Sequence, residues 1–207
     1  MHRAVILIIF FVLAVQVPGY SNNPYRRYDV RSGLNDNSVK DICQDHRGYI
    51  WLATKDGFCR FNGYRFDTFA SSRSGVNLNV DAICPHSDGN RIWAGCTDRL
   101  MLFDPSTSEL LPLSARSDDG QKIQCCLCLG YDVMGDLWIG TDNGIFSWNE
   151  DREELRHYSL GKGARYVKAL LIDDDGNIWA GSDAGLYLYD RLTDRFRSAT
   201  EREGQYT

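Results

Sequence analysis

One tryptophan returns four times along the chain at a nearly constant spacing, and this repeat constrains the fold more than any other feature. The four residues stand 42, 45 and 41 positions apart, as Trp51, Trp93, Trp138 and Trp179. Each follows Ile or Leu, precedes Gly or Ala by two positions, and precedes an aromatic residue by ten. Residue types that match at several positions around each tryptophan, with a period in the low forties, indicate a repeat architecture.

Each repeat unit holds short β-type runs separated by turn residues. Helical repeats of similar period need two amphipathic stretches of ten or more residues, and no unit contains them. Asx and Gly residues between the runs supply the turn chemistry of tight hairpins. Four short antiparallel strands per unit describe the blade of a β-propeller. We therefore predict an all-β fold, a β-propeller of about four blades of four antiparallel strands, with blades at about 37–70, 79–113, 123–158 and 166–199.

The repeated tryptophans have a physical role in this architecture. A blade buries both faces against its neighbours. A large indole beside a small residue lets side chains of adjacent blades pack into one another. Burying an indole contributes about 4 to 6 kcal/mol as an upper estimate, from roughly 150–250 Å² at about 25 cal/mol/Å². Stacking on a sugar is the alternative. The identical register favours the structural core, because a binding site rarely needs one residue four times.

Residues 1–21 have the pattern of a secretory signal peptide. Arg3 gives a positive start, 4–17 form an apolar run broken only by Gln16, and small residues follow. The run is short for a membrane span, so an uncleaved anchor is the minor alternative. No other stretch is long and apolar enough to cross a bilayer. The formal charge of −5, without a basic run, gives no reason to expect nucleic acid as a partner.

The first unit resembles a known repeat. Residues 33–45, 48–54 and 57–63 are similar to the two-component regulator propeller repeat, which occurs in periplasmic sensors of hybrid two-component histidine kinases of Gram-negative bacteria. The likeness is close in units one, three and four. Unit two is looser, with an extra residue at 88–91 and Arg99 where the other units have Gly.

The resemblance implies a function in signalling. Family members typically carry two seven-bladed propellers, a small β-sandwich, one membrane helix, and cytoplasmic kinase and regulator domains. Here four units end near residue 198 and the sequence stops at Thr207, so we expect no kinase portion in this chain. The resemblance therefore implies a periplasmic ligand-sensing propeller module of a phosphorelay, with carbohydrate oligomers as the expected ligand.

The ends of the repeat array bear on whether the ring closes. Residues 24–30 read as a lone strand of the type that completes a final blade. We expect unit four to supply its own outer strand near Phe196, which makes this strand surplus. We therefore favour an open or partial ring from a longer parent over a closed four-bladed propeller. An open arc leaves two apolar blade faces in water, so we expect self-association or missing blades as partners.

No catalytic constellation stands out. The aspartates six before three of the tryptophans, Asp45, Asp132 and Asp173, are read as Asx turns rather than as calcium ligands. The histidines have no Ser or Cys nucleophile beside them in the sequence pattern. We expect the chain to have no enzymatic activity and to bind no metal or cofactor. The alternatives are an exported propeller enzyme of lyase or glycosidase type, and a truncated remnant without independent activity.

Ligand capture is best placed on the loops that lead into the innermost strand of each blade. These loops ring the mouth of the central channel and carry amides, a guanidinium and an aromatic ring, which suit hydroxyl-rich ligands. Solvated loops without a ligand are the alternative at any one position. The candidate ligand-binding residues are Asn35, Asn37, Asn79, Gln124, Arg165 and Tyr166.

Seven cysteines are many for an exported chain of this size. Their spacings match no zinc template. We interpret them first as small buried hydrophobic residues and second as disulfide partners without a named pair. The odd count leaves at least one thiol free.

Overall fold

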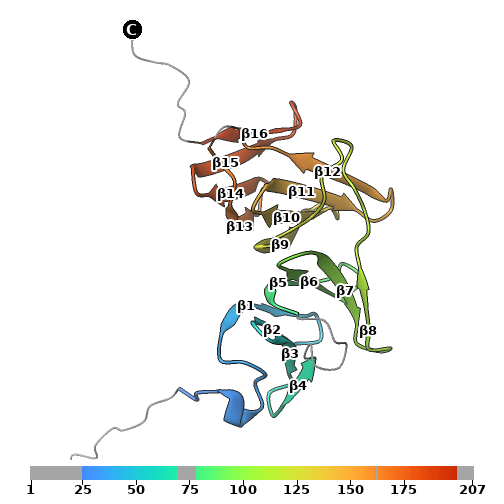
Figure 1. Ribbon diagram of the computed structural model, residues 1–207, viewed down its shortest axis with the longest axis vertical. Coiled ribbons are helices and arrows are strands. Elements are labelled where there is room, and N and C mark those ends of the chain that lie inside the picture. The colour runs from blue at the N-terminus through green and yellow to red at the C-terminus, as the bar shows by residue number, and fades with distance from the viewer. Residues whose placement is uncertain (1–24, 70–77, 162, 200–207) are drawn as a thin grey trace, which may run out of the picture.

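The computed structural model describes residues 25–69, 78–161 and 163–199 (Figure 1). The predicted signal peptide lies outside the described residues. Sixteen strands form four separate four-stranded antiparallel sheets, so the predicted all-β propeller with four blades is confirmed. Among the described residues no helix has the length and apolar character needed to cross a membrane.

Each blade uses consecutive strands in sequence order. Blade 1 contains β1 (Val39–Gln44), β2 (Ile50–Thr54), β3 (Gly57–Phe61) and β4 (Phe66–Phe69). Blade 2 contains β5 (Val80–Pro85), β6 (Ile92–Cys96), β7 (Leu100–Asp104) and β8 (Glu109–Pro112). Blade 3 contains β9 (Cys128–Tyr131), β10 (Leu137–Thr141), β11 (Gly144–Asn149) and β12 (Glu154–Tyr158). Blade 4 contains β13 (Val167–Ile172), β14 (Ile178–Ser182), β15 (Gly185–Asp190) and β16 (Arg195–Ser198).

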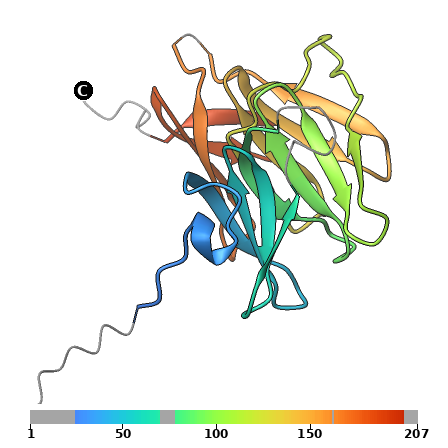
Figure 2. The same ribbon diagram turned by 60° about the horizontal axis from the view of Figure 1, so that its bottom comes forward.

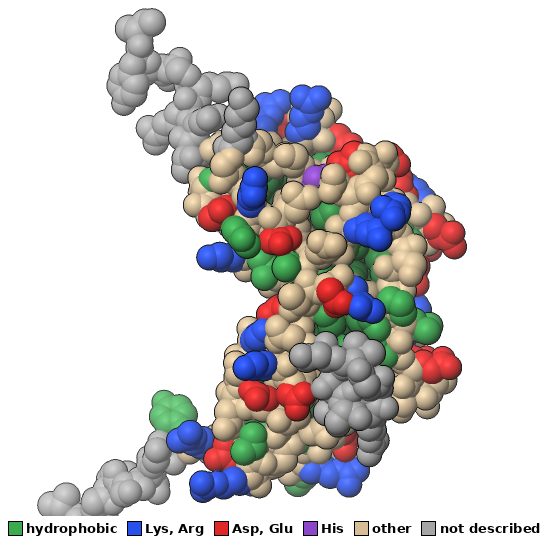
Figure 3. All heavy atoms as spheres, in the orientation of Figure 1, with side chains coloured by type: hydrophobic (Ala, Val, Ile, Leu, Met, Phe, Trp, Pro, Cys, Tyr) green, Lys and Arg blue, Asp and Glu red, His purple; other side chains and the backbone are tan. Residues whose placement is uncertain are grey.

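The four blades form an open arc. Strands β1, β5, β9 and β13 lie innermost and contact one another in that order. Three buried apolar clusters lie between successive blades, and among the described residues none joins blade 4 to blade 1. Figure 2 shows the sheets from a second direction, and Figure 3 shows the hollow between the two ends of the arc.

The repeated tryptophans occupy the sheet face that points toward the next blade. Trp51, Trp93 and Trp138 are 1%, 2% and 2% exposed and belong to the successive interfaces between blades. Trp179 is only half-buried. Its slot in β14 is equivalent, but no described blade follows blade 4. The fourth tryptophan therefore differs from the predicted core role because its packing partner is absent from the arc.

An aspartate caps three of the four indoles. The Oδ2 atoms of Asp45, Asp132 and Asp173 accept hydrogen bonds from the tryptophan Nε1 six residues later, at 2.8, 3.1 and 2.9 Å. Their Oδ1 atoms accept backbone N–H groups of the β1–β2-type turn, as in the expected Asx turns. One carboxylate thus closes the hairpin and satisfies the buried indole N–H, which sequence reasoning did not foresee.

The strand predicted at residues 24–30 is not formed. Residues 25–29 are irregular and a 3₁₀ turn, η1 (Val30–Ser32), follows them. The fourth strand position of blade 4 is already taken by β16, so the blade is complete without a strand from the N-terminal segment. Instead, the Tyr28 ring packs 4.9 Å from Phe61 and 5.6 Å from Phe66, which partly covers the free face of blade 1.

Candidate functional site

The candidate site lies on one face of the arc. This face carries the turn between the second and third strand of each blade and the loops that lead into β1, β5, β9 and β13, and we call it the mouth face. Sequential antiparallel order places these turns and loops together in every blade. Backbone hydrogen bonds join them, from Lys55 to Ser38, from Cys125 to Thr97 and from Asp183 to Tyr166.

A polar network on the mouth face connects blades 1 and 2. The Lys40 Nζ atom donates to the Asn79 Oδ1 atom at 2.7 Å and forms an ion pair with Asp81. The Asn79 Nδ2 atom donates to the Thr97 Oγ1 atom at 2.9 Å, and Thr97 donates to Asp81 at 3.3 Å. Of these four residues, the sequence analysis named only Asn79.

The sequence contains a pattern that could have identified two of the residues that the sequence analysis did not name. Lys40 and Asp81 are both the second residue of an innermost strand, and Lys168 has the same place in β13. At this slot the side chains of Lys40 and Asp81 meet where β1 packs on β5, near the mouth face. The side chains of Lys40 and Asp81 keep 28% and 21% of their surface exposed, so a ligand can reach both.

Two predicted ligand-binding amides are engaged within the protein. The Asn37 Oδ1 atom accepts the Val30 N–H at 3.0 Å, and the Asn35 Nδ2 atom donates to the Asp56 carbonyl at 2.6 Å. The Asn35 Oδ1 atom is buried without a partner among the described residues. These contacts hold the N-terminal segment against blade 1, so Asn35 and Asn37 have structural roles in this arrangement.

The remaining predicted residues stand apart from the Asn79 network. Gln124 and Arg165 are exposed, and Tyr166 is 48% exposed. The backbone N–H groups of Arg165 and Tyr166 donate to the Asp183 Oδ1 atom at 3.0 and 3.2 Å, which fixes this loop on blade 4. The mouth face therefore presents two separated polar regions, one on blades 1 and 2 and one on blade 4.

The cysteines add no nucleophile to this site. Within the described part of the chain all seven are free thiols. Burial raises the pKa of four of them to about 12: Cys59, Cys84, Cys96 and Cys128. Such thiols stay protonated at neutral pH and behave as small apolar side chains. No group of His, Cys, Asp or Glu among the described residues is arranged to hold a metal ion.

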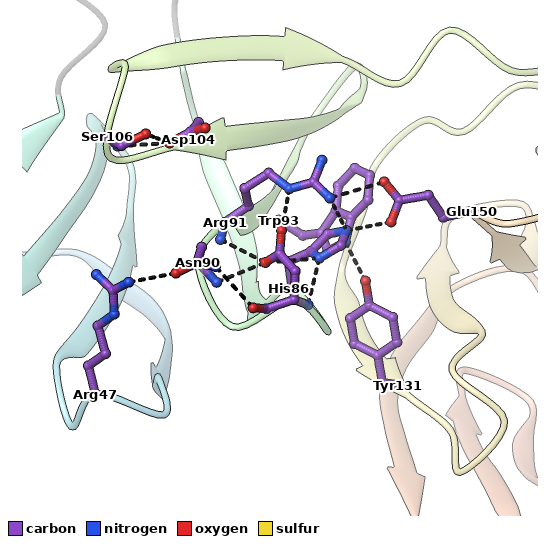
Figure 4. Close-up of polar contacts among 10 residues, drawn as sticks. Arg47, His86, Asn90, Arg91, Trp93, Asp104, Ser106, Tyr131 and Glu150 are labelled. Carbon is purple, nitrogen blue, oxygen red and sulfur yellow. Dashed lines mark hydrogen bonds and ion pairs between the residues drawn. The ribbon is translucent and has the colours of Figure 1, made fainter.

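The face of the arc opposite the mouth face carries a second polar cluster, between blades 2 and 3 (Figure 4). His86 stands where the other units have the capping aspartate, so the Trp93 indole N–H donates instead to the Tyr131 hydroxyl, at 2.8 Å. The His86 Nε2 atom lies 2.7 Å from the Glu150 Oε2 atom, and Arg91 lies 3.2 Å from the same carboxylate. These contacts tie blade 2 to blade 3.

The electrostatics of this cluster follow from its hydrogen bonds. The His86 Nδ1 atom accepts the Asp88 N–H at 3.0 Å, and the His86 Nε2 atom lies 2.7 Å from a Glu150 carboxylate oxygen and 3.2 Å from the Arg91 guanidinium. Burial of Asp88 opposes its ionisation, but hydrogen bonds from Asn90 and Arg91 outweigh burial and lower the pKa of the Asp88 carboxyl. The cluster is 4% exposed at His86 and is built for holding blades together.

Comparisons with known proteins connect this geometry to signalling. The profile of the two-component regulator propeller family matches residues 33–56 and 161–184. A histidine kinase P4 of Formosa agariphila is 31% identical over 67 residues, which are 32% of this chain and 5% of that protein. This chain thus spans a small part of the curated relative that it matches.

Comparison with solved structures shows the same fold. The extracellular domain of a Bacteroides thetaiotaomicron protein, assigned to a hybrid two-component system, is 25% identical with a TM-score of 0.65, over 78% of this chain and 22% of that chain. Streptogramin B lyase is 15% identical with a TM-score of 0.61, over 77% of this chain and 53% of that chain, which shows the fold alone. Propellers serve both binding and catalysis, so the repeat rather than the fold links this chain to sensors. Residues 33–56 and 161–184 of this chain thus match the two-component regulator propeller family, and the chain is similar to the extracellular domain of a hybrid two-component system.

Proposed function

We propose that this chain is a ligand-sensing module that works in the periplasm and recognises carbohydrate oligomers at its mouth face. The observation that carries the proposal is the exposed network of Lys40, Asn79, Asp81 and Thr97 on the mouth face, in a chain that matches the two-component regulator propeller family. An ammonium, an amide, a carboxylate and a hydroxyl offer both donors and acceptors. Hydroxyl groups of a sugar need both, because each hydroxyl donates and accepts.

The second polar region of the mouth face supports an extended ligand. Tyr166 on blade 4 exposes 48% of its surface beside the exposed Arg165. An aromatic face stacks on the apolar side of a pyranose ring, and a guanidinium donates to several oxygens. A ligand that engages both regions has to span from blades 1 and 2 to blade 4. That requirement favours an oligomer over a single sugar.

Calorimetric titration of the full chain with a panel of oligosaccharides tests the proposal. For a ligand that binds, we expect Asn79→Ala and Tyr166→Phe to differ. Loss of the amide weakens binding about tenfold, as for one or two hydrogen bonds, while the ring of Phe retains the stacking. Arg47→Ala, on the opposite face of the arc, is the matched control and leaves affinity unchanged.

Two results would contradict the proposal. Binding of an oligosaccharide with equal affinity by wild type and Asn79→Ala places the site elsewhere on the protein. Failure of every neutral and acidic oligosaccharide in the panel to bind the folded chain, at millimolar concentration, removes carbohydrate as the ligand class. Circular dichroism of each variant establishes that the fold is intact before titration.

A further inference from the structure

The connection between β8 and β9 is unlike the other loops between blades. It covers residues 113–127, whereas the corresponding loops cover 70–79 and 159–166. Long loops without secondary structure are uncommon in compact domains and are often functional. Its ends are fixed, because the Leu113 N–H donates to the Leu100 carbonyl at 2.9 Å and the Cys126 N–H to the Cys96 carbonyl at 3.2 Å. Residues 117–121 form a tight turn between these anchors.

This turn contacts blade 3 through His157 and through a hydrogen bond that the Asn143 side-chain amide donates to the Gln121 Oε1 atom at 3.2 Å. The ring of His157, on β12, is 8% exposed and packs 4.6 Å from the Phe146 ring. Its Nδ1 atom lies 2.7 Å from the Asp119 Oδ2 atom of the turn. Its Nε2 atom lies 2.7 Å from the Asn143 carbonyl oxygen of the β10–β11 turn.

These two partners fix the protonation state of the ring. A backbone carbonyl only accepts hydrogen bonds, and so does an ionised carboxylate. Hydrogen bonds from Ser117 and His157 lower the pKa of Asp119 to about 2, so its carboxylate is ionised at neutral pH. Both ring nitrogens of His157 must therefore donate, which requires the imidazolium. His86 is the opposite case, since its Nδ1 atom accepts a backbone N–H.

We propose that residues 117–121 are a pH-dependent strap that the protonated His157 ring clasps to blade 3. When the ring loses one proton, a lone pair faces either the carbonyl or the carboxylate, and one of the two hydrogen bonds is lost. The Asn143 carbonyl belongs to a β-turn held by the sheet, whereas Asp119 lies on the loop. The strap is therefore the part that moves away as pH rises.

The sign of the pH dependence follows from both partners. Both hydrogen bonds of the ring require both of its protons, so one of the bonds is broken when a rise in pH removes a proton. Asp119 has a lowered pKa, so its contribution is present above its ordinary value of 3.8 and is lost only as pH falls toward about 2. The clasp thus weakens as pH rises, and on the acidic side it is lost only where the Asp119 carboxylate becomes protonated.

The groove beside His157 is lined by more carboxylates than cationic groups. The groove beside it has a volume of about 610 Å³ and is lined from the strap, β12 and β16. The titratable and charged groups that line it are Asp118, Asp119, Glu154, Arg156, Tyr158, Asp194 and Arg195. Arg156 is shared between Glu154 at 3.0 Å and Asp194 at 3.2 Å, which leaves the carboxylates in excess. The strap supplies one wall, so its position sets the width of this groove.

Two measurements on the full chain test the proposal. The ¹⁵N chemical shifts of the His157 ring report its protonation directly, and we expect both nitrogens to be protonated at pH 5.5. Hydrogen exchange of residues 114–122, corrected for the intrinsic pH dependence of exchange, reports strap opening. We expect protection to fall about tenfold between pH 5.5 and pH 8.5, the factor that corresponds to about 1.4 kcal/mol.

Matched variants separate the clasp from general loosening. His157→Gln and Asp119→Asn each remove the pH step, and the second keeps the test decisive if the first does not fold. Gln121→Ala removes the neutral contact with Asn143, at 3.2 Å, so it lowers protection equally at both pH values and keeps the step. A singly protonated His157 ring at pH 5.5, or a full pH step in folded His157→Gln, would overturn the proposal.

Discussion

Trp138 and Trp179 occupy the same slot of neighbouring blades, and replacing each by alanine measures what the next blade contributes. Both indoles donate to the aspartate six residues earlier, at 3.1 and 2.9 Å. Trp138 is 2% exposed between blades 3 and 4, whereas Trp179 is half-buried on the free face of blade 4. The pair therefore matches in chain position and hydrogen bonding and differs in burial.

The expected costs follow from this difference. Trp138→Ala removes a ring that lies 5.3 Å from Tyr158 and 4.9 Å from Tyr189, and leaves a cavity in the interface. Such truncations lower the free energy of unfolding by about 3 to 5 kcal/mol, and the buried Asp132 carboxylate loses a donor at about 1 kcal/mol more. Trp179→Ala loses only partly buried surface and should cost about 1 to 2 kcal/mol.

Urea unfolding followed by far-ultraviolet circular dichroism measures both values without relying on tryptophan fluorescence. Trp138→Phe is the control for the hydrogen bond, since it retains most of the apolar surface and should cost less than Trp138→Ala. Each midpoint is measured at several protein concentrations, which detects association. Equal costs for Trp138→Ala and Trp179→Ala, independent of concentration, would refute the open arc, because they require the free face of blade 4 to be buried within one chain.

Two further predictions concern the free face of blade 4 and the thiols. Leu171 and Leu186 line a shallow apolar groove there and are 62% and 43% exposed, so Leu171→Asp and Leu186→Asp should shift a self-associating chain toward monomer in analytical ultracentrifugation. Leu192→Asp, in a turn and 98% exposed, is the control, and equal effects of all three would count against this face. With a thiol-reactive chromophore at pH 8, we expect Cys125 to react first and the other six thiols to react only after denaturation. Several fast thiols in the folded chain would show that burial does not protect them.

The repeat made the blades predictable from sequence. The register around each tryptophan places every strand, because hydrophobic and turn residues recur with the pairing of the sheet. The open arc also followed from the repeat, since a fourth outer strand near Phe196 left residues 24–30 without an edge. That segment was nevertheless predicted as a strand, and the prediction was wrong because a strand forms only where it pairs with another strand, and residues 25–29 pair with none. The Tyr28 ring packs against the Phe61 ring instead.

The candidate site was harder to predict because its members depend on the blade-to-blade geometry. Asn35 and Asn37 lie in a mouth loop, as expected, but their side-chain amides are hydrogen-bonded to backbone groups of the protein. Lys40 and Asp81 sit 41 residues apart, and only the packing of β1 on β5 brings their charges together. A period-two pattern assigns a residue to a face of one strand and gives no information about the neighbouring blade.

Unit two shows how a repeat can lose a buried partner without losing its fold. A buried indole N–H without an acceptor costs free energy, so the replacement of aspartate by His86 requires another acceptor for Trp93. Tyr131 of unit three supplies it, at a position where unit one has Gln44 and unit four has Ile172. The departure in one unit is thus matched by a departure in the next. Because both changes face one interface, they convert a hydrogen bond within a blade into a hydrogen bond between blades 2 and 3.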